Sequence, residues 1–169
     1  MTDNTLRQLS LQVGEALEHL GATVTTAESC TGGWIAKVIT DISGSSAWFE
    51  RGFVTYSNDA KHQMIGVESS TLETHGAVSE AVVREMAQGA LYAADADYAI
   101  SVSGIAGPQG GSKEKPVGTV WFGFASKQDG TVAYHQLFEG DREAIRRRST
   151  EYALQTLWDE FLKNKLDTV

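Results

Sequence analysis

The sequence predicts one α/β domain over residues 1–169, with a mixed sheet that helices cover on both faces. Its 169 residues, 41% of them hydrophobic and 21% charged, suffice for one stable core and would leave two cores small. Segments with helical periodicity alternate with short β-branched segments in the first half. Three strand-like segments then precede a last amphipathic helix. The expected element order is αβαβααβββα.

The first half of the chain is predicted to alternate helices and short strands. Leucine and valine recur at three- and four-residue intervals over residues 4–20, which predicts a helix that ends at Gly21. The β-branched segment 22–26 is expected to be a buried strand. Apolar spacing over residues 34–42 predicts a second helix, and residues 52–57 are expected to form the next strand.

Two further helices are predicted after this strand. Residues 58–67 read as a short helix that Asn58 or Asp59 would cap. Ser79 is the expected N-cap of a longer helix over residues 79–96. The apolar residues of the longer helix follow one stripe, so we expect this helix to face the core.

The second half is predicted to contain three strands and a long loop. Residues 98–107 read as a strand that runs into a glycine-rich loop, and residues 108–116 have loop composition throughout. Segments 118–126 and 132–139 flank Asp129-Gly130, a dipeptide typical of tight hairpin turns. We therefore expect these two segments to be antiparallel neighbours.

The last predicted helix spans residues 140–165, with Asp141 as its N-cap. Its side chains expected to face the core are Ile145, Ala153, Leu157 and Phe161. Arg142 and Arg146 lie four residues apart on one face of this helix, so together they could bind a phosphate. A cluster of surface charges explains the two arginines equally well.

The composition excludes several classes of protein. A net charge of −8 argues against general nucleic-acid binding, and no apolar run reaches the roughly 18 residues that a membrane span needs. The amino terminus lacks the layout of a signal peptide, so we expect a cytoplasmic protein. The lone Cys30 permits no intrachain disulfide, and the four histidines lack the spacing of metal ligands. We expect neither a metal nor a cofactor.

The segment TAESCTGGW holds the first candidate site. A strand that ends at Ser29 and a helix that begins near Thr31 would place the serine hydroxyl at the carboxyl edge of the sheet, where α/β folds bind ligands. The amides of Cys30, Thr31, Gly32 and Gly33 would then belong to the first helical turn and could stabilise a phosphate or an oxyanion. A serine before a helix is also a common N-cap, and no GxSxG or phosphate-loop template is present. An SxxK dyad that begins at Ser29 would need Lys at position 32, where this sequence has Gly.

Cys30 competes with Ser29 for the role of nucleophile, because a thiolate is intrinsically the better nucleophile. Adjacent side chains at the start of a helix diverge, so both cannot approach one substrate atom. A lone cysteine is more often a small buried hydrophobic residue, and we interpret Cys30 in that way.

Tyr56 and Lys61 form a second candidate cluster, which could converge with Ser29 at the same edge of the sheet. Lysine acts as a general base only when neutral, and with an ordinary pKa of about 10.4 only about one in a few thousand is neutral at pH 7. Burial or a neighbouring cation would have to lower that pKa. By itself, Lys61 reads as a solvated helix residue.

Ser103, Gly104 and Gly107 form a third cluster, where a strand opens into a loop. Such a loop can bring its backbone close to a flat ring or a phosphate. An ordinary tight connection explains these glycines about as well.

Six segments in this order resemble the CinA carboxy-terminal domain family, whose stand-alone members include nicotinamide-nucleotide amidohydrolases. The segments are AESCTGG, GFVTYSNDAKHQMIGV, HGAVSE, SGIAGPQGG, KPVGTVWFG and GDREAIR. Each segment alone is weak, but six in register make the resemblance specific, and it covers nearly the whole chain, from about residue 5 to residue 162. The resemblance implies a three-layer α/β/α sandwich, in agreement with the element order.

The resemblance also implies an activity, the hydrolysis of the carboxamide of nicotinamide mononucleotide to nicotinate mononucleotide and ammonia without a metal. Ser29 would attack the amide carbon and Lys61 would take its proton. Tyr56 would orient or relay within this dyad, and the amides from Cys30 to Gly33 would hold the oxyanion.

For substrate binding, the resemblance implies roles for the last helix and the third cluster. Arg146, with Arg142 in support, would bind the substrate phosphate or keep Lys61 neutral. The loop from Gly104, through Gly107, to Pro108 would form part of the pocket wall. Ser103 departs from the threonine expected in the family, but it retains a hydroxyl.

Two functions of different classes therefore stand at this point. One is a serine–lysine amidohydrolase of pyridine mononucleotides. The other is a non-catalytic module that holds a nucleotide phosphate with the same helix terminus and arginines. Phosphoanhydride hydrolysis fits poorly, because no acidic cluster indicates a magnesium site. We expect a small-molecule substrate, no membrane partner and a homodimer.

Overall fold

The computed structural model describes residues 3–166 and contains a five-stranded mixed sheet. In order across the sheet, the strands are β2 (Phe53–Val54), β1 (Val24–Glu28), β3 (Tyr98–Gly104), β4 (Thr119–Ser126) and β5 (Gly130–Leu137). Strand β1 is parallel to both β2 and β3, whereas β4 is antiparallel to β3 and β5. The predicted α/β class with a mixed sheet is confirmed.

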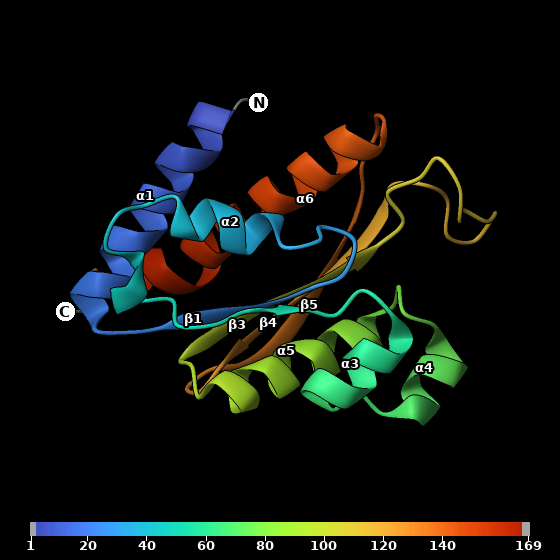
Figure 1. Ribbon diagram of the computed structural model, residues 1–169, viewed down its shortest axis with the longest axis horizontal. Coiled ribbons are helices and arrows are strands. Elements are labelled where there is room, and N and C mark those ends of the chain that lie inside the picture. Colours follow the sequence, from blue (N-terminus) through green and yellow to red (C-terminus); the bar gives the residue numbers. More distant parts are fainter. Residues whose placement is uncertain (1–2, 167–169) are drawn as a thin grey trace.

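Helices cover both faces of this sheet, which gives three layers (Figure 1). The upper layer contains α1 (Asp3–Leu20), α2 (Trp34–Thr40) and α6 (Arg142–Thr156). The lower layer contains α3 (Asn58–Ile65), α4 (Ser69–His75) and α5 (Glu80–Ala94). The remaining helical segments are η1 (Ser45–Ala47), the π-helical η2 (Leu157–Leu162) and α7 (Lys163–Leu166). Among the described residues, no helix is long and apolar enough to cross a membrane.

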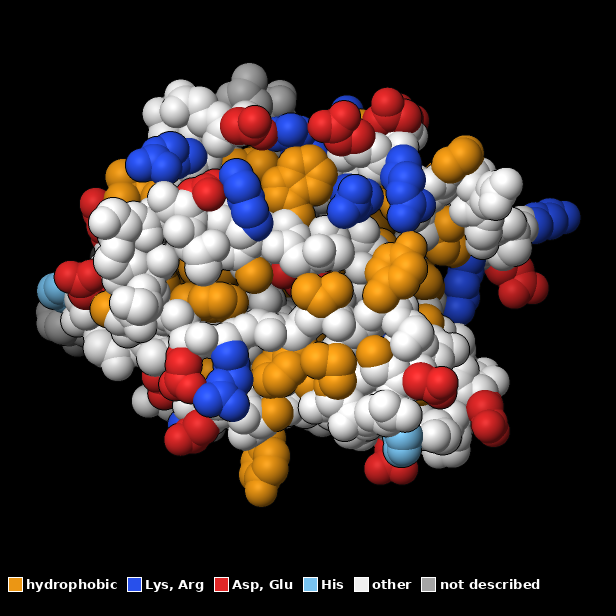
Figure 2. All heavy atoms as spheres, in the orientation of Figure 1, with side chains coloured by type: hydrophobic (Ala, Val, Ile, Leu, Met, Phe, Trp, Pro, Cys, Tyr) orange, Lys and Arg blue, Asp and Glu red, His pale blue; other side chains and the backbone are white. Residues whose placement is uncertain are grey.

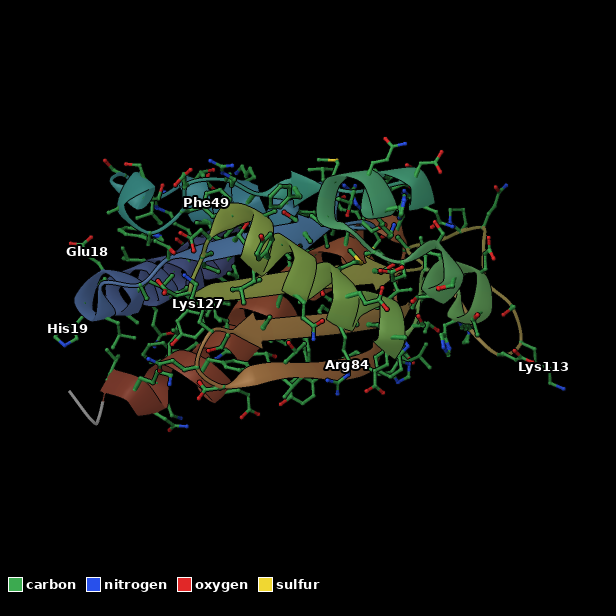
Figure 3. The ribbon with its side chains drawn as sticks, turned by 90° about the horizontal axis from the view of Figure 1, so that it is seen from below. Glu18, His19, Phe49, Arg84, Lys113 and Lys127 are labelled. Atoms are coloured by element: carbon green, nitrogen blue, oxygen red, sulfur yellow. The ribbon has the colours of Figure 1, made fainter. Side chains whose placement is uncertain are left out.

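The core consists of two apolar layers, one on each face of the sheet. On the upper face, the Phe122 ring lies 4.5 Å from the ring of Tyr152, measured between centroids. On the lower face, α5 packs so closely that a Cβ at Gly123 would lie 2.3 Å from the carbonyl oxygen of Val83. A glycine at this point of β4 therefore lets the helix lie directly against the strand. Figure 3 shows α5 across this lower face.

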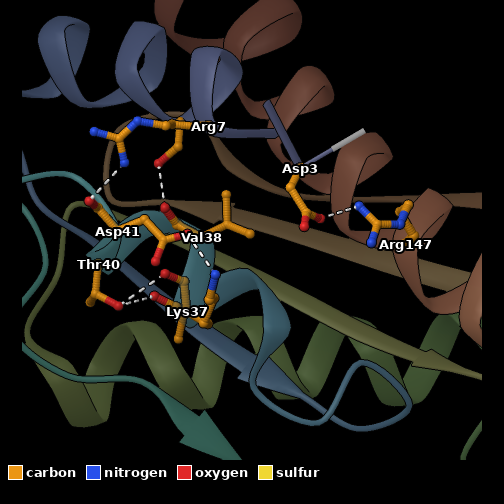
Figure 4. Close-up of polar contacts among 9 residues, drawn as sticks. Asp3, Arg7, Lys37, Val38, Thr40, Asp41 and Arg147 are labelled. Atoms are coloured by element: carbon orange, nitrogen blue, oxygen red, sulfur yellow. Dashed lines mark hydrogen bonds and ion pairs between the residues drawn. The ribbon is translucent and has the colours of Figure 1, made fainter. Parts of the chain in front are cut away.

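Polar contacts fix α1 against α2 in the upper layer (Figure 4). The Ser10 hydroxyl donates to the carbonyl of Val38 over 2.8 Å, and Arg7 donates to the carbonyl of Asp41 over 3.2 Å. Since α2 begins at Trp34, just after the turn that follows Ser29, these contacts hold the helix beside the candidate site in place.

Several element predictions are confirmed. The first helix and the β4–β5 hairpin occur as expected, and residues 108–116 contain neither helix nor strand. Ser79 caps α5 by accepting from the amide of Val82, and Asp141 caps α6 by accepting from the amide of Ala144. The four side chains of the last helix predicted to face the core are all buried.

Other element predictions are wrong. The N-cap of α3 is Ser57 rather than Asn58 or Asp59, because the helix already begins at Asn58 and the Ser57 hydroxyl accepts from the amide of Ala60. Helix α4 was not predicted. Strand β2 covers only two residues of the expected 52–57, because the carbonyls that follow it turn toward Lys61.

Candidate active site

The candidate site is a pocket of about 300 Å³ at the carboxyl ends of β1, β2 and β3. These three strands are parallel, so the residues that follow them meet at one edge of the sheet. The predicted site residues that line the pocket are Ser29, Cys30, Tyr56, Lys61, Ser103, Gly104, Gly107 and Arg142. Thr31, Gly32, Gly33 and Arg146 line a separate hollow beside α2.

Ser29 and Lys61 form a hydrogen bond inside this pocket. The Lys61 Nζ lies 2.9 Å from the Ser29 Oγ. It also donates to the carbonyls of Thr55, over 2.9 Å, and Tyr56, over 3.1 Å. Helix α3 carries Lys61 inward, and only 1% of its surface remains exposed. The interpretation of Lys61 as a solvated lysine is therefore wrong.

Burial changes the acid–base behaviour of Lys61. Removal from water disfavours the ammonium form and lowers the pKa of Lys61 from 10.5 to about 8. At pH 7, about one lysine in ten is then neutral, instead of about one in three thousand. The lowered pKa comes from burial and not from the charge of Arg146, which was one of the two roles predicted for that arginine.

Tyr56 contacts Ser29 and Lys61 through its main chain and not through its phenol. Its carbonyl accepts from Lys61 and, over a longer 3.4 Å, from the Ser29 hydroxyl. Tyr56 is 61% exposed at the mouth of the pocket, and its phenol accepts from the Arg142 guanidinium over 3.2 Å. Arg142 also donates to the Gly107 carbonyl over 2.8 Å, so its charge is fixed at the rim.

The turn after Ser29 differs from its prediction. Helix α2 begins at Trp34 rather than near Thr31, since Gly32 and Gly33 adopt left-handed φ angles of 61° and 100°. The amides of Ile35 and Ala36, in the first helical turn, donate to the carboxylate of Glu28, a residue that was not predicted to have a role. The helix terminus is thus occupied by the protein itself and does not open into the pocket.

Arg146 lies on the other side of the same turn. Its Nε donates to the carbonyl of Cys30 over 3.0 Å, and its Nη2 donates to the carbonyl of Thr31 over 3.3 Å. Figure 2 shows lysine and arginine side chains gathered over α2 and α6 on this face. Although Arg142 and Arg146 are one helical turn apart, Arg142 lines the pocket and donates to Gly107, whereas Arg146 lines the hollow beside α2 and donates to Cys30 and Thr31. The two guanidinium groups therefore do not form the single phosphate site predicted for them.

Cys30 lines the pocket but is only 5% exposed and packs in the upper apolar layer. Burial raises the pKa of the Cys30 thiol to about 12. The thiol therefore remains protonated at neutral pH, which makes it a poor nucleophile.

The third cluster forms one wall of the pocket. Ser103 is buried at the end of β3, and Gly104 and Gly107 follow it. Gly104 packs directly against β4, since a Cβ there would lie 2.7 Å from Val120 Cγ2. Among residues 3–166, no group of three or more His, Cys, Asp or Glu side chains could hold a metal ion.

Comparison with known proteins identifies the family of this chain. The family model of the CinA C-terminal domain matches residues 6–161. The chain belongs to the CinA family.

Relatives of this CinA domain carry a more specific name. This chain is 71% identical over 164 residues to "Nicotinamide-nucleotide amidohydrolase PncC" of Escherichia coli strain K12. The alignment covers 97% of this chain and 99% of the relative. A protein of the same name from Enterobacter agglomerans is 63% identical and covered completely, again with 97% of this chain. The crystal structure of competence damage-inducible protein A (ComA) from Klebsiella pneumoniae superimposes with a TM-score of 0.88 at 41% identity, covering 92% of this chain and 96% of that chain.

Three polar residues at or beside the pocket were not predicted as site residues. Asn58 and Gln109 line the pocket, but Asn58 was interpreted as a helix cap and Gln109 as part of a loop. Glu28 was not predicted to have a role. An acidic residue at the end of a buried strand could have indicated one, because a buried carboxylate requires hydrogen-bond partners.

Proposed function

We propose that this CinA domain hydrolyses the carboxamide of nicotinamide mononucleotide to nicotinate mononucleotide and ammonia, in pyridine nucleotide recycling. The relatives named above support the substrate and the reaction. The observation that carries the proposed mechanism is the hydrogen bond between the buried Lys61 and Ser29. It pairs a nucleophile with a base inside a pocket that has a fixed cation, Arg142, at its rim.

In the first step, neutral Lys61 takes the proton of Ser29 while the serine oxygen attacks the amide carbon. The Thr55 and Tyr56 carbonyls bind two N–H groups of the amine. In the neutral form, the third direction, toward the Ser29 Oγ, holds the nitrogen lone pair. The two carbonyls therefore orient Lys61 as an acceptor for the serine proton.

In the second step, Lys61 returns this proton to the nitrogen of the tetrahedral intermediate, and ammonia leaves. The substrate is then held as an ester on Ser29. A water molecule that gives its proton to Lys61 hydrolyses this ester, which releases the carboxylate product and regenerates the serine.

The amides of Cys30 and Thr31 are the proposed donors to the oxyanion. The Gly32 amide already donates to the Ser29 carbonyl over 3.1 Å, so it is engaged in the turn. In other enzymes, the loss of one such donor costs about 3 to 4 kcal/mol of transition-state stabilisation.

Arg142 is the proposed ligand of the substrate phosphate. It lines the pocket, and its guanidinium is oriented by Gly107 and by the phenol of Tyr56. The exposed Tyr56 ring lies beside this charge and could cover the substrate at the mouth of the pocket.

The test is turnover of nicotinamide mononucleotide by the purified protein in EDTA, with nicotinate mononucleotide and ammonia both quantified. We expect both products in equal amounts. Nicotinamide riboside, which lacks the phosphate, should be a poorer substrate. Binding of the mononucleotide without either product, over a wide range of enzyme concentration, would instead establish the non-catalytic module.

A further inference from the structure

We infer that Glu28 and Arg146 are paired positioning residues that hold the turn of residues 29–33, here called the Ser29 turn, in its reactive shape from two sides. Neither lines the pocket, so each acts through the turn rather than on the substrate. The inference rests on the proposed function, because it assigns the turn a part in catalysis.

Glu28 accepts hydrogen bonds from donors in the Ser29 turn and at the start of α2. Its Oε1 accepts from the Thr31 hydroxyl over 2.6 Å and from the Ile35 amide over 2.9 Å. Its Oε2 accepts from the Ala36 amide over 3.0 Å. Glu28 is 1% exposed, so these bonds compensate a carboxyl group removed from water. They join the end of β1, the turn and the start of α2 into one unit.

Arg146 donates hydrogen bonds to two backbone carbonyls of the Ser29 turn. Its guanidinium spans the carbonyls of Cys30 and Thr31 and lies 5.7 Å from the centroid of the Trp34 ring. The planar, forked guanidinium can bind two neighbouring carbonyls at once, which a lysine ammonium on a flexible stem does not reproduce. The ring supports its orientation through a cation–π contact.

The two contacts fix where the amides of the turn point. In a trans peptide, the N–H lies opposite to the C=O of the preceding residue. The Thr31 carbonyl faces Arg146, and the next N–H, that of Gly32, accordingly points back to the Ser29 carbonyl. By the same relation, anchoring the Cys30 carbonyl turns the Thr31 N–H away from Arg146. Within the part of the chain that the structure describes, that N–H has no hydrogen-bond acceptor.

Gly32 allows this arrangement. Its φ of 61° favours glycine, and a Cβ there would lie 3.1 Å from the Arg146 Nη2. The close approach of the guanidinium and the shape of the turn thus depend on each other.

The test compares Arg146→Gln and Glu28→Gln with a matched control, Arg147→Gln. Arg147 is the next residue on α6 and lies 4.9 Å from the same Trp34 ring, but it pairs with Asp3 (Figure 4). With nicotinamide mononucleotide as substrate, we expect the first two variants to lose about tenfold to a hundredfold in kcat and to change KM by less than about threefold. The midpoint of the pH profile should stay near that of the wild type. The control should retain its kcat.

Several results would overturn the inference. A raised KM with unchanged kcat in Arg146→Gln would make Arg146 a substrate ligand. An unchanged kcat in that variant would remove any role in catalysis. If Glu28→Gln does not fold, the half-buried Arg146 still decides the question.

A second readout separates this inference from the proposed substrate. A fluorophosphonate labels a serine that is both activated and next to oxyanion donors, whatever the natural substrate is. If the wild type does not turn over nicotinamide mononucleotide, the proposed function fails. The inference then still predicts that Ser29 is labelled more slowly in Arg146→Gln than in the wild type and in Arg147→Gln. Equal labelling in all three, or no labelling of the wild type, would contradict it.

Discussion

The ratio kcat/KM for nicotinamide mononucleotide should rise about tenfold between pH 7 and pH 9 and level off above the pKa of Lys61. Burial lowers that pKa from 10.5 to about 8, so the neutral fraction of Lys61 grows from about one-tenth to about nine-tenths over this interval. A base that kept a pKa of 10.5 would instead give a rise of about a hundredfold and no plateau. The shape of the profile therefore reports the burial of the lysine.

The assay is the initial rate of nicotinate mononucleotide formation, followed by chromatography at a substrate concentration far below KM. The range from pH 7 to 9.5 keeps the substrate phosphate doubly charged, because the second pKa of a phosphate monoester is about 6. The Cys30 thiol, whose pKa burial raises to about 12, does not titrate in this range. Lys61→Arg is the control, since a guanidinium cannot act as a base there.

Two outcomes would refute this reasoning. A flat profile, or a rise that continues without a plateau to pH 9.5, would contradict a buried base with the lowered pKa. Retention of the wild-type profile by Lys61→Arg would exclude Lys61 as the base.

Three further predictions concern single residues. Gly32→Ala should lower kcat and should also lower the free energy of unfolding, measured by urea titration, by about 1 kcal/mol. Gly21→Ala is the control, because Gly21 has a similar φ of 62° but free space around it, and this variant should lower only the free energy of unfolding. Because the pKa of Lys61 falls on folding, its protonation opposes the native state. The wild type should therefore gain roughly 3 kcal/mol of stability relative to Lys61→Met as pH rises from about 8 to 10.5, measured by chemical denaturation. Arg142→Lys should raise KM for nicotinamide mononucleotide more than for nicotinamide riboside; an equal effect on both would remove Arg142 from phosphate binding.

Local patterns predicted the elements whose causes are local. The first helix follows from apolar spacing, and the caps at Ser79 and Asp141 follow from short side chains that reach an amide three residues later. The start of α2 could not be found in this way, because its amides are bound by Glu28, a strand residue that lies seven and eight positions earlier. Typical capping patterns do not extend that far along the chain.

The sequence predicted which residues of the candidate site lie near one another, but not the features of the site that depend on tertiary packing. Parallel strands bring the residues after them to one edge, so Ser29 and Lys61 could be expected near each other although they lie 32 positions apart. The burial of Lys61 depends on how α3 packs, which its own sequence does not reveal. Likewise, helical spacing places Arg142 and Arg146 on one face of α6. Only the tertiary structure shows that Arg142 contacts Gly107 while Arg146 contacts the Ser29 turn.

The most direct measurement is turnover of nicotinamide mononucleotide by Ser29→Ala and Cys30→Ala side by side, with binding followed by calorimetry. We predict that Ser29→Ala loses roughly a thousandfold or more in kcat while it still binds the substrate, and that Cys30→Ala keeps most of its activity. Turnover by Ser29→Ala near the wild-type rate, or a Cys30→Ala variant that folds and is equally inactive, would contradict the assignment of Ser29 as the nucleophile.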